Sequence, residues 1–188
     1  MLVEGMAAHG WSVAIPGYSL APEATLTEIA QEISMSLDWL AGNGASHGIA
    51  GPVVLSGWSA GAHLAALALD HPAVTAGLAV SGVYDLAPIR DTALNIPLKM
   101  TNEEIANLSP LSLPIVRKPL AIAYGAKELP ALVWDSKRFH EARKAANAPG
   151  ELVEIDGADH FTILDELRRP DGKLVKLALT LSASHPAS

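Results

Sequence analysis

Short apolar runs alternate with helical stretches along most of the chain. Five of these runs have the length of strands, and they are continuously rich in Val, Leu, Ile and Ala. Continuous apolar content is typical of strands covered on both faces, and intervening helices indicate parallel pairing. The pattern predicts an α/β fold, a three-layer α/β/α sandwich with a mostly parallel sheet. The expected strands are residues 11–16, 52–56, 76–81, 119–124 and 151–155.

Helix signals lie between the expected strands. Thr25 and Glu28 have capping-box spacing, and the apolar face that follows predicts a helix ending at Gly42. Further helices are expected over residues 130–147 and from Pro170 onward, because proline is favoured in the first helical turn. The first helix would bury Leu26, Ile29, Ile33, Leu37 and Leu40, and the last Leu174, Leu177, Ala178 and Leu181.

The length of 188 residues fits one compact domain, so residues 1–188 are expected to form a single unit. Residues 85–117 lack periodicity and are rich in Pro, Leu and Asn, which predicts a cap-like connection or an ordered loop. The chain has no cysteine, and this excludes disulfides and thiolate chemistry.

Charge is distributed unevenly along the chain. The first basic side chain is Arg90: residues 1–89 carry seven acids and no Lys or Arg, and the net charge is −7. This distribution repels phosphate groups, so no nucleic acid partner is expected. No apolar run approaches the ~18 residues of a membrane span, and Met1 is not followed by a basic signal segment. We expect a cytoplasmic protein without a membrane partner; the sequence leaves open whether it is a homo-oligomer.

An apolar strand, a Gly-x-Ser-x-Gly turn and an Ala/Leu-rich helix follow one another at residues 53–66. This order is typical of a nucleophile elbow, in which Ser59 projects above the sheet and Gly57 and Gly61 allow the strand and helix to approach. The alternative interpretation is a structural glycine turn. The context favours Ser59 as a catalytic nucleophile.

A serine nucleophile needs a base and an orienting acid. His160 lies in a turn-rich loop directly after the last expected strand and is predicted to be the base, whereas His63 is expected to pack or hydrogen-bond. Glu128 follows the preceding strand and a glycine turn, and Asp135 is its competitor for the role of acid. Glu128 has a second interpretation, as an acid at a helix N-terminus. No histidine pair has metal-ligand spacing, and neither a metal nor an organic cofactor is expected.

The order Ser59, Glu128, His160 resembles that of the α/β-hydrolase superfamily. Four segments resemble the group of bacterial kynurenine formamidases (arylformamidases) and hormone-sensitive-lipase-like esterases: Tyr-Ser-Leu-Ala-Pro-Glu at 18–23, Ser-Ala-Gly-Ala-His-Leu at 59–64, Ser-Gly-Val-Tyr-Asp-Leu at 81–86, and the Gly-x-x-Glu-Leu-Pro form at 125–130. The last favours formamidases over ordinary esterases.

Members of this group carry a His-Gly-Gly motif after an earlier strand, and this chain contains none. The resemblance covers the last two thirds of a family member, and the motif-bearing strand would lie between residues 11–16 and 52–56. Either these strands close up, or another chain fills the gap, or the sequence is incomplete; we expect the last.

The resemblance implies acyl transfer to water from a small ester or formamide, most simply an arylformamide such as N-formylkynurenine. Alternatives are a short-chain carboxylesterase and a non-catalytic remnant that serves as a binding module. The Ala60 N–H is the expected oxyanion donor, and Trp58 is expected to contact the substrate.

Overall fold

The computed structural model describes residues 3–183, with a parallel sheet at the centre of the fold. Neighbouring strands all pair in parallel, in the order β1-β2-β3-β4. Four predicted strands are therefore confirmed, with ends that move by no more than two residues. The strands are β1 (Val54–Trp58), β2 (Ala76–Val80), β3 (Leu120–Gly125) and β4 (Leu152–Ile155).

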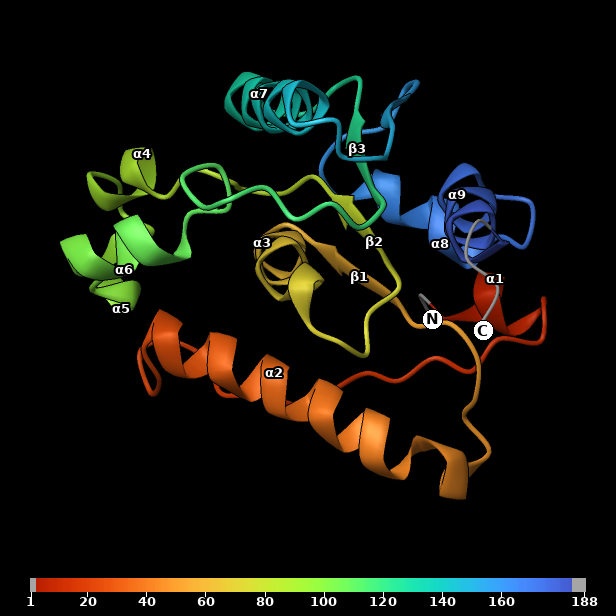
Figure 1. Ribbon diagram of the computed structural model, residues 1–188. Helices are drawn as coiled ribbons and strands as arrows, with labels where there is room; N and C mark the ends of the chain where they lie inside the picture. The colour runs from red at the N-terminus through yellow and green to blue at the C-terminus, as the bar shows by residue number, and fades with distance from the viewer. Residues whose placement is uncertain (1–2, 184–188) are drawn as a thin grey trace.

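Helices cover both faces of this sheet (Figure 1). One apolar core joins α2, α3 and α7 to one face, and a second joins α9 and the region around α1 and α8 to the other. Every residue of β2 and β3 is buried, which explains their uninterrupted apolar sequences. The predicted three-layer sandwich is confirmed. These helices are α1 (Glu4–Ala7), α2 (Leu26–Asn43), α3 (Ala60–Leu67), α7 (Pro130–Ala145), α8 (Asp165–Arg168) and α9 (Lys173–Ala183).

The three predicted helices correspond to α2, α7 and α9. The capping box of α2 is present: the Thr25 hydroxyl accepts from the Glu28 N–H, and the Glu28 carboxylate accepts from the Thr25 N–H. Pro130 opens α7 as expected, while α9 begins three residues after Pro170. Single 3₁₀ turns lie at η1 (Gly44–His47), η2 (Ala68–Asp70) and η3 (Thr162–Leu164).

Residues 11–16 do not form a strand, so this prediction is wrong. The segment is non-helical and mostly exposed, and 70% of the Ile15 surface is accessible to solvent. A strand needs a neighbour that completes its hydrogen-bond ladder. Within residues 3–183, β1 pairs with β2 alone, and residues 11–16 do not close up on its outer edge. Apolar composition without a pairing partner leaves the segment irregular.

Residues 85–117, predicted to be a cap-like connection or an ordered loop, contain three short helices. The last of them has its own capping box, formed by Thr101 and Glu104. The second oxygen of Glu104 accepts from the backbone N–H and the hydroxyl of Thr27, at the start of α2. This carboxylate fastens the connection to the main body of the fold. The helices are α4 (Ala87–Arg90), α5 (Asn95–Leu98) and α6 (Asn102–Leu108).

None of the helices in residues 3–183 combines the length and the apolar character needed to cross a membrane.

Candidate active site

Ser59 occupies a sharp turn between β1 and α3. Its backbone has φ 56° and ψ −118°, a left-handed conformation that costs free energy in any residue other than glycine. Its N–H donates to the carbonyl of Val80 on the neighbouring strand, 2.9 Å away, and its carbonyl accepts from Ala62 and His63 in α3. These bonds hold the turn in place, so the hydroxyl is fixed at the carboxyl end of the sheet.

The two glycines of the turn play different roles. A Cβ on Gly57 would collide with the backbone carbonyl of Gly61, so the close approach predicted at position 57 is confirmed. A Cβ on Gly61 would meet nothing within 4 Å, and the same prediction is wrong there. The backbone carbonyl of Gly61 is the group that leaves no room for a side chain at Gly57, whereas a side chain at Gly61 itself would have space.

Three side chains that are distant in sequence form a hydrogen-bonded series at this edge. His160 Nε2 lies 3.2 Å from Ser59 Oγ, and His160 Nδ1 lies 2.8 Å from Glu128 Oε1. Since a carboxylate accepts but does not donate, Nδ1 carries the proton and Nε2 accepts from the serine hydroxyl. The series has the connectivity of a Ser-His-acid triad, with one member after each of β1, β3 and β4.

The Glu128 side chain has no exposed surface, whereas 20% of the His160 side chain is accessible. A backbone turn from the Glu128 N–H to the carbonyl of Gly125 sets its position. Leu129 is the N-cap of α7, so the Glu128 carboxylate is directed to the imidazole rather than to the helix start. Exclusion of water strengthens the attraction between this carboxylate and a protonated histidine.

Asp135, the competing acid, faces another part of the fold. Its Oδ2 accepts from the backbone N–H groups of Tyr84 and Asp85, in the loop after β2. Burial raises the pKa of Asp135, and the two N–H bonds oppose the rise. Arg138, one turn further along α7, pairs with the Asp85 carboxylate at 2.9 Å. Asp135 therefore ties the loop to α7 and makes no contact with His160.

The loop that carries His160 is held by its neighbours. The Asp159 carboxylate accepts from the N–H groups of Phe161 and Thr162 and from the Thr162 hydroxyl, and the bonds to Thr162 are the main reason that the pKa of Asp159 is lowered. A Cβ on Gly125 would collide with the Ala158 carbonyl, so β3 and this loop pack backbone to backbone. His160 is thus placed by a turn that these hydrogen bonds and this close backbone packing hold.

Trp58 makes contacts that sequence reasoning missed. Its indole Nε1–H donates to the backbone carbonyl of His160 at 2.8 Å, and its ring centroid lies 4.8 Å from that of the imidazole. Strand alternation was the available signal, because it directs Trp58 away from α3 and toward the loop after β4. Contact between Trp58 and a substrate stays a prediction.

With this geometry established, comparison with known sequences identifies the family. A sequence profile described as "alpha/beta hydrolase fold" matches residues 2–117. The chain belongs to the α/β-hydrolase family. Two curated relatives are named kynurenine formamidase: one from Danio rerio is 31% identical over 186 residues, and one from Salmo salar is 30% identical over 187. Each alignment covers 92% of this chain but only 62% and 63% of the relative, so the chain spans less than two thirds of their length.

Solved α/β-hydrolases share the fold. A crystal structure from Silicibacter sp. tm1040, provisionally named a thioesterase, superposes with a TM-score of 0.83 at 29% identity and covers 95% of this chain and 68% of its own. An esterase from Pyrobaculum calidifontis superposes at 0.73 and 17% identity, over 90% of this chain and 65% of its own. The second likeness concerns the fold alone.

The remaining predicted residues of this member of the α/β-hydrolase family have clear positions. Ala60 is the first residue of α3, where backbone N–H groups lack partners within the helix, so its donor is free of the helical ladder. His63 is buried, and its Nδ1 lies 3.0 Å from the carbonyl of Val83. Burial lowers the pKa of His63 to about 4. Its hydrogen-bonding role agrees with the prediction.

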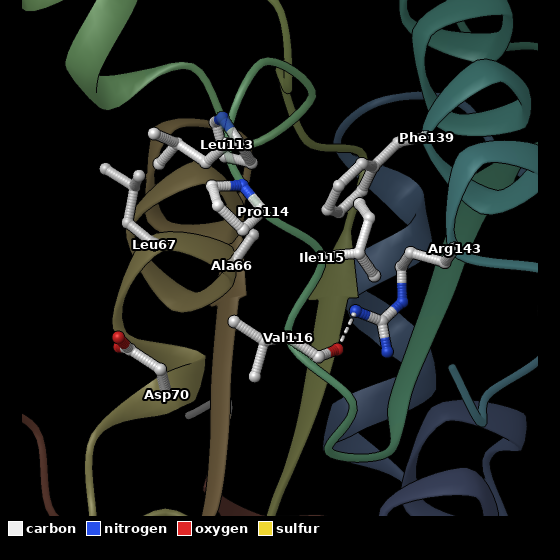
Figure 2. Close-up of a pocket in the computed structure, with 10 residues that line it drawn as sticks. Ala66, Leu67, Asp70, Leu113, Pro114, Ile115, Val116, Phe139 and Arg143 are labelled. Atoms are coloured by element: carbon white, nitrogen blue, oxygen red, sulfur yellow. Dashed lines mark hydrogen bonds between the residues drawn. The ribbon is translucent and has the colours of Figure 1, made fainter. Parts of the chain in front are cut away.

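A hollow of about 460 Å³ lies at the other end of α3 (Figure 2). Ala66 and Leu67 form one wall, two helical turns beyond Ser59, and Phe139 and Arg143 of α7 face them across residues 110–116. Arg143 donates to the carbonyls of Val116, Lys118 and Pro149, and burial lowers its pKa to about 10. None of the lining residues belongs to the triad. Across residues 3–183, no group of three or more His, Asp or Glu side chains is arranged to hold a metal ion.

Proposed function

We propose that this chain carries a serine hydrolase site that cleaves a small acyl ester or formamide. The observation that carries the proposal is the hydrogen-bonded series from Ser59 through His160 to Glu128. A neutral imidazole with its proton on Nδ1 presents a free Nε2 to the serine hydroxyl, which is the arrangement a general base requires.

The reaction proceeds in two transfers. His160 takes the Ser59 proton while Oγ forms a bond to the substrate carbonyl carbon; the bond to the leaving alcohol or amine then breaks, and His160 returns the proton to the leaving group. Water, deprotonated by the same imidazole, attacks the acyl-enzyme, and Ser59 recovers its proton as the acid departs. Glu128 holds the tautomer and stabilises the imidazolium formed in each transfer.

The Ala60 N–H is the oxyanion donor that this chain itself supplies. It follows the nucleophile and lies at the start of α3, where the helix dipole also favours negative charge. Loss of one oxyanion donor typically costs about 10²–10³ in rate. Within residues 3–183 the donor identified is the Ala60 N–H, and the sequence has no His-Gly-Gly motif, so this chain is proposed to turn over slowly.

The substrate is proposed to be an arylformamide of the N-formylkynurenine type, a small molecule met in the cytoplasm. The two curated relatives named kynurenine formamidase support this choice. A second candidate is a short-chain carboxylesterase, because the series of Ser59, His160 and Glu128 would cleave an ester by the same two transfers. Neither a nucleic acid nor a membrane partner is proposed, and a homo-oligomer stays open.

Hydrolysis by the purified chain tests the proposal. We expect release of formate from N-formylkynurenine, and slower cleavage of an aryl acetate, both abolished in Ser59→Ala. Ser12→Ala, a change at an exposed serine, is the matched control and should keep the wild-type rate. Equal rates for wild type and Ser59→Ala would reject the enzyme and leave a non-catalytic binding module. Cleavage of the ester without deformylation would favour the carboxylesterase.

A further inference from the structure

Trp58 contacts the loop that carries His160 in two ways. The indole N–H is 2.8 Å from the His160 carbonyl oxygen, a normal hydrogen-bond length, and the indole and imidazole rings are 4.8 Å apart with a tilt of 40°. The ring centroid of Phe161 lies 5.7 Å from that of the indole. Trp58 itself is half-buried against the core that includes Ile155 and Ile163, on the face opposite α3. The Trp58 side chain is therefore held both by packing against this core and by the hydrogen bond of its indole N–H.

These contacts matter because Trp58 directly precedes Ser59 in the chain. Trp58 and Ser59 are consecutive, so one short segment holds His160 both by its backbone carbonyl and by Nε2. Glu128 holds the remaining ring nitrogen. The backbone and both nitrogens of one residue are thus fixed from two strand ends. A shift of the loop away from β1 would stretch the Trp58 bond and the Ser59 bond together.

We propose that Trp58 is a positioning residue for His160, and this inference rests on the proposed function. The indole N–H sets the distance between the histidine backbone and the elbow, which in turn sets the 3.2 Å between Nε2 and Oγ. The indole ring also lies close to the imidazole, with a tilt of 40° between them, and aromatic rings attract cations. The ring thereby stabilises the imidazolium that forms each time the serine proton is transferred.

Kinetics separate positioning from substrate contact. Trp58→Phe keeps a ring and removes the N–H, and Trp58→Leu removes both. We expect kcat on an aryl acetate to fall about tenfold in Trp58→Phe and further in Trp58→Leu, with KM within about twofold of wild type. A rise in KM at unchanged kcat would overturn the proposal in favour of substrate contact, and so would the absence of any change.

The chain offers a matched control. Trp39 packs against His47 with a ring separation of 5.3 Å and a tilt of 36°, far along α2 from the elbow. Trp39→Phe removes an indole from a similar tryptophan–histidine pair and should leave kcat and KM unchanged. Circular dichroism melting establishes that each variant is folded; if Trp58→Leu does not fold, Trp58→Phe decides alone.

A spectroscopic readout keeps the inference testable without turnover. The proton on His160 Nδ1, bonded to a buried carboxylate, should give a downfield NMR signal that exchanges slowly with water. In Trp58→Phe we expect this signal to broaden or disappear, whereas Trp39→Phe should retain it. A signal identical to wild type in Trp58→Phe would overturn the inference. If the wild-type chain shows this signal but no hydrolysis above Ser59→Ala, the proposed function fails while the positioning role is still decided by the variants.

Discussion

The two halves of the candidate site differ in how they are built. The acid-and-base half lies on β3 and β4, where Glu128 is fully buried and the histidine loop packs backbone to backbone against Gly125. The nucleophile half lies on β1, whose outer edge has no partner within residues 3–183, and Ala60 at the start of α3 is exposed. One half is enclosed by its own chain and the other faces open surface. Proton transfer and oxyanion binding are therefore supported unequally.

The contrast teaches that a triad and an oxyanion hole are separable parts. The three side chains proposed for proton transfer are in contact here. The oxyanion donor proposed here is the Ala60 N–H, at the start of α3. Substitutions in each half of the site, followed by kinetic and stability measurements, test whether the two halves act independently.

The largest effect is expected at the contact between the halves. His160→Gln removes the base and should lower kcat/KM by at least about 10⁴-fold. The double variant Ser59→Ala/His160→Gln should be no slower than either single variant, because the two residues act as a unit. Steady-state hydrolysis of an aryl acetate measures this. Additive losses would show that they act separately.

Within the acid-and-base half, Glu128→Gln should lower kcat by about 10³-fold, because an amide neither fixes the Nδ1–H tautomer nor neutralises the imidazolium. Asp135→Asn is the matched control: its amide oxygen can still accept from Tyr84 and Asp85, and kcat should stay within about threefold. A larger loss in Asp135→Asn than in Glu128→Gln would reverse the assignment of the acid.

In the nucleophile half, Gly57→Ala should reduce the free energy of unfolding by about 3 kcal/mol, since the new Cβ meets a backbone carbonyl that cannot move aside cheaply. Gly61→Ala, where a Cβ meets open space, should change it by less than about 1 kcal/mol. Urea unfolding compares the two. Equal losses would show that the helix and strand are not packed as closely as described.

The smallest effect concerns His63, directly beneath the elbow. Its pKa of about 4 in the folded chain lies below the unfolded value of about 6.5, so the unfolded state binds the proton more readily. Stability contributed by the neutral ring is complete above pH 6.5 and is lost as the pH falls toward 4. Between pH 7 and 5 we expect a loss on the order of 2 kcal/mol that His63→Gln does not show. His47→Gln, at an exposed histidine, should follow the wild-type slope.

Local patterns predicted the parts of this fold that depend on local physics. The capping box at Thr25 and the strand–turn–helix at Ser59 each depend on a few neighbouring residues, and the sequence predicted both. The sequence left open whether Glu128 or Asp135 is the acid, because the answer depends on contacts between distant segments. Asp135 faces the loop after β2, and Glu128 faces His160. The strand expected at residues 11–16 was wrong because pairing is a property of two segments. The bond from Trp58 to His160 joins residues 102 positions apart. Strand alternation indicates the face of the sheet on which Trp58 lies, but it does not identify His160 as the partner.

The meeting of three strand ends at Ser59 has a practical consequence. A reagent that modifies only an activated serine, such as a fluorophosphonate, depends on all three ends being assembled at once. The extent of labelling at the Ser59 hydroxyl would then measure the fraction of native molecules in a mixture. Loss of labelling on heating or in urea would report the cooperative unfolding of this edge of the sheet.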